Sequence, residues 1–95
     1  MNKVYLQRWE ESERGLGTRP DGCSLHLTLK DRDKYLTKIY EGTTFTNVPD
    51  EYDRIVGNPI EISISDVVFS EVNVNGALRI SEYEMKNLLK MGEIV

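Results

Sequence analysis

The 95-residue sequence contains a single cysteine, Cys23, and a single histidine, His26. One cysteine cannot form an internal disulfide, so no disulfide framework holds this chain together. One cysteine and one histidine are also too few for a common zinc site, and we expect neither a metal nor a cofactor. The sequence has no apolar run long enough to cross a membrane, and its first residues lack the apolar stretch of a secretory signal. We therefore expect a cytoplasmic protein without a membrane partner.

The chain also lacks an excess of positive charge. It carries 12 lysines and arginines against 16 acidic residues, for a net charge of −4. A protein of this charge does not collect phosphates as a general nucleic-acid binder does, but a few local arginines can still hold a small anion. At 95 residues, we expect residues 1–95 to form one small domain that gains stability by homo-oligomerisation.

The most unusual stretch that the sequence does contain is residues 14–26, with the sequence RGLGTRPDGCSLH. Three glycines, a proline and two arginines fall between Arg14 and Gly22. Pro20-Asp21-Gly22 suits a tight turn, because proline fixes φ and glycine accepts a positive φ. A constrained backbone of this kind can direct Arg14 and Arg19 toward an anion. The alternative is that the stretch only joins the first strand to the next element.

Apolar residues alternate or recur at helical spacing in several segments. These patterns predict strands at 3–9, 24–27, 60–64 and 77–80, and helices at 29–41 and 82–91. Capping residues mark the starts of the helices: Thr28 with Asp31, and Ser81 with Glu84. The first helix is expected to bury Leu29, Leu36, Ile39 and Tyr40, and the last one Met85, Leu88, Leu89 and Tyr83.

Two segments give less decisive patterns. Residues 42–59 contain prolines, glycines and asparagines and are expected to be irregular. Residues 66–72 follow a good capping residue, Ser65, and favour a short helix, whereas Val67-Val68-Phe69 also favours a strand. The order of elements predicts an α+β fold, with a small mixed or antiparallel sheet and two to three helices.

No set of catalytic residues is complete. Ser24 and His26 share one face of a predicted strand, but the G-x-S-x-G turn of an esterase is missing. The glycine-rich stretch lacks the Gly-Lys-Ser/Thr ending of a phosphate-binding loop. We therefore expect a binding protein that is not an enzyme.

Ligand binding is easier to argue, because guanidinium groups bind phosphates in pairs of hydrogen bonds and aromatic rings stack on bases. The alternative for each arginine is a surface ion pair, such as Arg54 with Asp50 or Asp53. Asp21 either holds Arg19 in place or closes the turn. The candidate ligand-binding residues are Arg19, Arg79, Arg54, Trp9, Tyr52, Asp21 and His26.

Three segments of the chain resemble a known family. They are SERGLGTRPDGCSLHL at 12–27, VPDEYDR at 48–54 and NGALRI at 75–80. Together they resemble the first Thoeris anti-defence family of phages and prophages. The chain departs from that pattern at Leu16, where the family has tryptophan, and at Asp53, where it has serine.

The resemblance implies a sponge in the host cytoplasm that binds cyclic ADP-ribose-type signals, or cyclic oligonucleotides, without cleaving them. It also implies an oligomer with pockets at or near subunit contacts. Arg19 and Arg79 would then bind the ligand phosphates, with Arg54 behind them. Replacing Arg19 with alanine would abolish ligand retention and leave the fold intact.

Two other functions stay open at this point. One is a small acidic inhibitor that binds a host defence complex, such as a CRISPR-type complex, through its carboxylates. The other is a hydrolase that acts on the same signal with His26 or a pair of carboxylates.

Overall fold

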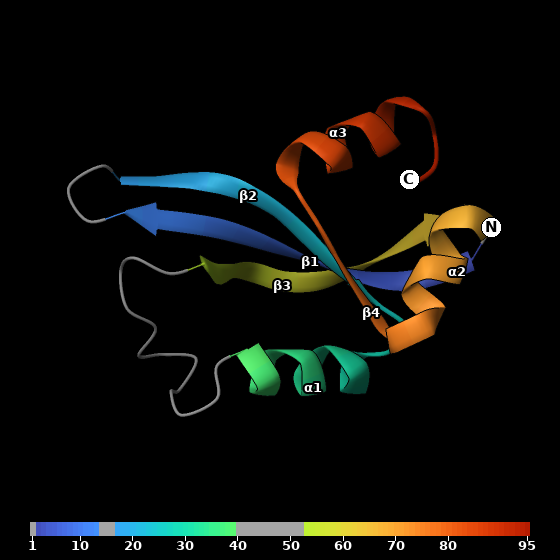
Figure 1. Ribbon diagram of the computed structural model, residues 1–95, viewed down its shortest axis with the longest axis horizontal. Helices are drawn as coiled ribbons and strands as arrows, with labels where there is room; N and C mark the ends of the chain where they lie inside the picture. Colours follow the sequence, from blue (N-terminus) through green and yellow to red (C-terminus); the bar gives the residue numbers. More distant parts are fainter. Residues whose placement is uncertain (1, 14–16, 40–52) are drawn as a thin grey trace.

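The computed structural model describes residues 2–13, 17–39 and 53–95 (Figure 1). The described elements are β1 (Asn2–Glu13), β2 (Gly17–His26), α1 (Leu29–Ile39), β3 (Asp53–Ile64), α2 (Asp66–Asn75), β4 (Ala77–Ile80) and α3 (Glu82–Lys90). The strands form one antiparallel sheet in the order β3-β1-β2-β4. This arrangement confirms the α+β prediction, with an antiparallel sheet and three helices in one domain.

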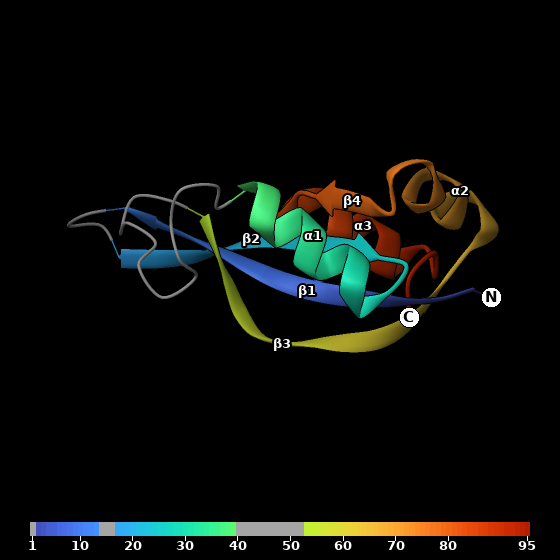
Figure 2. The ribbon, with the colours of Figure 1, turned by 90° about the horizontal axis from the view of Figure 1, so that it is seen from below.

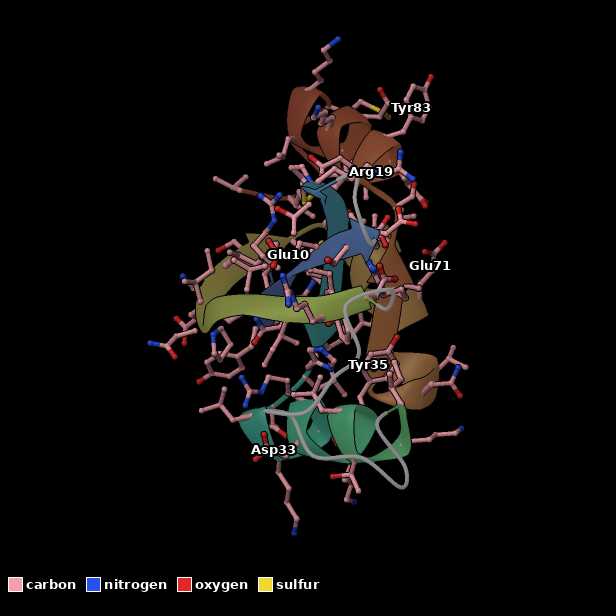
Figure 3. The ribbon with its side chains drawn as sticks, turned by 90° about the vertical axis from the view of Figure 1, so that its left-hand side faces the viewer. Glu10, Arg19, Asp33, Tyr35, Glu71 and Tyr83 are labelled. Carbon is pink, nitrogen blue, oxygen red and sulfur yellow. The ribbon has the colours of Figure 1, made fainter. Side chains whose placement is uncertain are left out.

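A helix covers each face of the sheet. Figure 3 looks along the sheet and shows α3 on one side and α1 on the other. The α3 face holds the larger core, to which β1, β2 and β3 contribute alternate residues and α2 adds two valines. That core comprises Val4, Leu6, Cys23, Leu25, Ile62, Ile64, Val68, Val72, Ile80, Met85 and Ile94. The α1 face holds a smaller core of Trp9 and Leu36, with Tyr35 and Ile55 against them.

The glycine-rich stretch is mostly a strand, so the prediction of a tight turn at Pro20-Asp21-Gly22 is wrong. These residues belong to β2, which pairs with β1 up to Gly17 and Glu13 in a long hairpin. Figures 1 and 2 show this hairpin extending past the ends of the helices. Its outer half lacks apolar alternation because cross-strand pairs of charged residues, such as Glu11 and Arg19, take the place of a buried face.

A bulge explains why β2 needs its glycine. The β1–β2 register shifts so that residues 21 and 22 of β2 both lie opposite Trp9. Gly22 has a φ of 74°, and a Cβ atom there would lie 2.0 Å from the carbonyl oxygen of Ile80. Only glycine fits this conformation and this close approach.

β3 begins earlier than predicted, because residues 53–56 of the segment expected to be irregular are already paired with β1. A bulge interrupts this pairing at residues 57–59, opposite Gln7. The fully buried Gln7 amide donates hydrogen bonds to the carbonyl oxygens of Val56 at 3.2 Å and Gly57 at 3.1 Å. Its Oε1 accepts a bond of 2.9 Å from Nη1 of Arg32, so one polar side chain joins the bulge to α1.

The predicted helix starts are confirmed. The Thr28 hydroxyl accepts a hydrogen bond from the Asp31 amide at 3.0 Å, and Ser81 accepts one from Glu84 at 3.2 Å. Ser65 accepts from Val68 in the same way, and residues 66–75 form a helix rather than a strand. None of the described helices combines the length and the apolar character needed to cross a bilayer.

The predicted apolar faces are only partly right. In α1, Leu36 is buried, but Leu29 and Ile39, at the two ends of the helix, are each 46% exposed. In α3, Met85 is buried, whereas Leu89 and Tyr83 are exposed. The predictions for Tyr40, for Tyr52 and for residues 42–52 lie outside the described residues.

Candidate functional site

Arg79 of β4 is the centre of one group of the predicted site residues, which we call the arginine cluster: Arg79, Trp9, Asp21 and Asp53. The guanidinium lies over the Trp9 ring, 4.9 Å from the ring centroid. Its Nη2 donates to Oδ2 of Asp21 at 3.1 Å and to Oδ2 of Asp53 at 3.4 Å. Its Nη1 donates to two backbone carbonyl oxygens, each at 3.1 Å. The arginine thus joins β4 and β2 to the start of β3.

The two carboxyls compensate the charge of the arginine. Burial raises the pKa of Asp53 to about 6, and a hydrogen bond and repulsion from Asp21 add to this rise. Above that pH, two carboxylates share one guanidinium. Arg79 therefore offers no uncompensated positive charge to a phosphate.

Trp9 lies beneath Arg79 and is only 1% exposed. Its indole Nε1 donates to the Ser24 hydroxyl at 2.8 Å, and its ring meets the Tyr35 ring edge-on at 6.3 Å. A ring that is packed in this way has little open surface for a base, and the stacking role of Trp9 stays a prediction.

His26 is fully buried beside the same network. Its Nε2 lies 2.7 Å from Oγ of Ser24, which confirms that the two residues share a face of the strand. Burial, followed by the nearby Arg32, lowers the pKa of His26 to about 4, so the ring is neutral at pH 7. Its Nδ1 has no hydrogen-bond partner among the described residues. Ser24 is equally buried, so the pair is closed to solvent and lacks the third group that would orient the histidine.

Arg19 and Arg54 form cross-strand ion pairs on the hairpin and its neighbouring strand. Arg19 lies 2.8 Å from Glu11, and Arg54 lies 2.7 Å from Glu10. Of the aspartates considered for Arg54, Asp50 lies outside the described residues. Glu10 and Glu11 are neighbours on β1, so strand alternation directs the two pairs to different faces of that strand. Such partly exposed pairs contribute about 0–1 kcal/mol, so a ligand can replace either partner at small cost.

A hollow of about 330 Å³ lies where the hairpin leaves the helices, and we call it the hairpin hollow. Its lining residues are Arg8, Trp9, Glu10, Thr18, Arg19, Pro20 and Val56. Of the predicted residues it brings together Arg19 and Trp9. It adds Arg8, which the sequence analysis missed and which pairs with Glu82 at 3.2 Å.

The structure thus divides the predicted site. Arg79, Asp21 and Trp9 belong to the arginine cluster, and His26 is buried beside it. Arg19 and Arg54 lie apart from this cluster, in ion pairs with residues of β1. Tyr52 is outside the described residues. Two members of this region, Asp53 and Tyr35, are not among the residues predicted from the sequence. The sequence carries a positional signal only for Asp53, where the family pattern has serine.

Among the described residues, no group of three or more histidines, cysteines or acidic residues is arranged to hold a metal ion. Comparison of the chain with known protein families, with curated proteins and with solved structures found no match.

Proposed function

We propose that this protein binds a small anionic nucleotide signal, of the cyclic ADP-ribose or cyclic oligonucleotide kind, and retains it without cleaving it. In this proposal it is a phage or prophage anti-defence protein of the host cytoplasm. The resemblance of residues 12–27 to the first Thoeris anti-defence family supports the ligand class. The net charge of −4 supports a small ligand over a nucleic-acid chain.

The burial of Ser24 and His26 is the main observation that favours binding over hydrolysis. Both side chains have zero exposed surface, so a substrate does not reach the hydroxyl or the ring. A histidine with a pKa of about 4 is also a weak general base at pH 7. The pair therefore serves as an internal hydrogen bond of the smaller core rather than as a nucleophile and its base.

A hydrolase could use a pair of carboxylates instead, but Asp21 and Asp53 are both bound to an arginine. Asp21 and Asp53 both bind the Arg79 guanidinium, which fixes them against the sheet. General acid–base catalysis needs a carboxyl that is free to reach the substrate proton. This arrangement favours a structural role for the two aspartates.

The experiment mixes the pure protein with a panel of cyclic ADP-ribose isomers and cyclic oligonucleotides, filters it, heats the retained protein and separates the released material by HPLC. We expect one class of ligand to be retained and released intact. The Ser24→Ala variant serves as the control for cleavage, and any compound that it releases should also be intact.

Two results would contradict the proposal. A changed product that disappears in Ser24→Ala would make the protein a hydrolase. No retention across the panel, together with capture of a host protein, would favour the acidic inhibitor.

Homo-oligomerisation is part of the proposal, because a small domain gains stability by burying more surface. Light scattering on the purified protein tests it. We expect a mass of at least twice the 10.9 kDa of one chain, and a mass of 10.9 kDa would reject oligomerisation.

A further inference from the structure

A second and larger hollow has none of the predicted arginines in its lining. It has a volume of about 690 Å³ and runs between α1 and the junction of α2 with β4. We call it the α1 groove, and it is lined by Asp31, Lys34, Tyr35, Lys38, Ile39, Asn75 and Ala77. This volume is within the range of pockets that hold small-molecule ligands.

One part of the α1 groove is cationic. Lys34 and Lys38 are four residues apart on α1, so they lie on the same face of the helix. Neither lysine forms an ion pair with a described residue. Arg8, Arg19, Arg54 and Arg79 each have a carboxylate within 3.4 Å. These four arginines are thus neutralised by acidic partners, whereas the two lysines of the α1 groove are available to bind an anion.

Asp31 and Asn75 add polar groups to the lining of the groove. The Asp31 carboxylate accepts a hydrogen bond from the Thr28 hydroxyl at 3.0 Å, which holds it at the first turn of α1. The Asp31 carboxylate lies beside Gly76, the residue that ends α2. Carboxylate and amide oxygens accept hydrogen bonds from the hydroxyl groups of a ribose or from the amino group of a base.

The wall of the α1 groove includes an aromatic ring in a fixed position. Tyr35, labelled in Figure 3, meets the Trp9 ring at a centroid distance of 6.3 Å and the His26 ring at 5.3 Å. The buried Trp9–Ser24–His26 hydrogen bonds thus support a tyrosine that borders the groove. A ring held in this way loses little entropy when a base stacks on it.

We propose that the α1 groove is the ligand site, with the phosphates on Lys34 and Lys38 and the nucleoside against Tyr35, Asp31 and Asn75. The identity of the ligand as a nucleotide rests on the proposed function. The position of the anion rests on the two lysines alone.

The test compares two double variants by isothermal titration with the nucleotide that the panel selects. Lys34→Ala/Lys38→Ala removes the groove lysines. Lys3→Ala/Lys90→Ala removes the same charge from β1 and α3, outside the groove lining. We expect affinity to fall roughly tenfold to a hundredfold in the first variant only, as for the loss of charge-assisted hydrogen bonds. Circular dichroism checks that both variants fold.

A third variant, Arg19→Ala, separates the two hollows. Unchanged affinity in this variant is the expected result. If Arg19→Ala abolishes binding while the groove variant binds like the original chain, the hairpin hollow is the site and the inference is overturned.

Inorganic pyrophosphate tests the anion position without the proposed function. We expect it to shift the amide NMR signals of residues 34–38 in the original chain and to leave them unshifted in Lys34→Ala/Lys38→Ala. Such shifts without nucleotide retention would reject the proposed function and keep the anion site. Nucleotide retention without any shift would reject the site and keep the function.

Discussion

At the scale of single residues, Asp53 and His26 link the stability of the fold to pH in opposite directions. The pKa of Asp53 is raised to about 6, so the folded state binds more protons than the unfolded state between about pH 4 and 6. The pKa of His26 is lowered to about 4, so the unfolded state binds more protons between about pH 4 and 6.5. The two contributions overlap in one pH window and partly cancel.

The Asp53→Asn variant removes the first contribution. Stability from Asp53 is present in full below about pH 4 and is lost as pH rises through about 6. The variant should therefore be more stable than the original chain at pH 7, by about 1 kcal/mol, since solvent screens a partly exposed carboxyl. Urea unfolding followed by the fluorescence of Trp9, the single tryptophan, measures the difference. Lower stability of the variant at pH 7 would show that the charged Asp53 stabilises the arginine cluster.

The His26→Asn variant removes the second contribution. Stability from a neutral buried histidine is complete above about pH 6.5 and is lost as pH falls toward 4. The variant should be less stable at pH 7 by about 1–3 kcal/mol, because a buried hydrogen bond to Ser24 is disturbed. Its stability should then fall as pH rises from about 4 to 6, which is the trend that Asp53 alone produces. The same unfolding experiment at several pH values measures this slope, and a slope of the opposite sign would contradict the assignment.

Single residues also show how far the site could be predicted. Strand alternation was enough to place Ser24 and His26 on one face. The contact of Arg79 with Trp9 joins residues 70 positions apart, and it depends on the strand order β3-β1-β2-β4, which no local pattern encodes. Lys34 and Lys38 look like the solvated face of a helix until the α2–β4 junction is placed beside them.

At the scale of elements, helix starts were the most predictable feature and the hairpin the least. Thr28, Ser65 and Ser81 mark helix starts by local hydrogen bonds, and each cap is present. The outer hairpin gave no strand pattern, because its cross-strand contacts pair charges such as Glu11 with Arg19. The turn predicted at Pro20-Asp21-Gly22 is a β-bulge. Glycine takes a positive φ in both structures, so the residue type alone did not distinguish them.

A glycine substitution tests the role of this bulge. Gly22→Ala should destabilise the fold by about 3 kcal/mol or more, because its Cβ would lie 2.0 Å from a backbone oxygen that cannot move aside cheaply. Gly17→Ala is the matched control, since Gly17 has a φ of 82° but no atom near its Cβ position. The control should cost only about 1–2 kcal/mol of backbone strain. Thermal unfolding measures the stability of both variants. Equal losses of stability would show that the close approach of Gly22 to Ile80 does not determine the cost of the substitution.

At the scale of the whole molecule, the two faces of the sheet have different roles. The α3 face holds most of the apolar core. The α1 face buries Trp9 and the Ser24–His26 pair, and the α1 groove lies beside them. A closed hydrogen-bonded interior thus lies beside an open groove that carries Lys34 and Lys38, and we propose that this groove holds an anion without reacting with it.

Phosphorus NMR of the nucleotide mixed with an equal amount of protein tests this account most directly, because one spectrum reports both binding and cleavage. The account predicts signals that shift or broaden on mixing, stay constant in number for hours, and return to their original positions when the protein is heated and removed. New phosphorus signals that grow with time in the presence of the protein would contradict it.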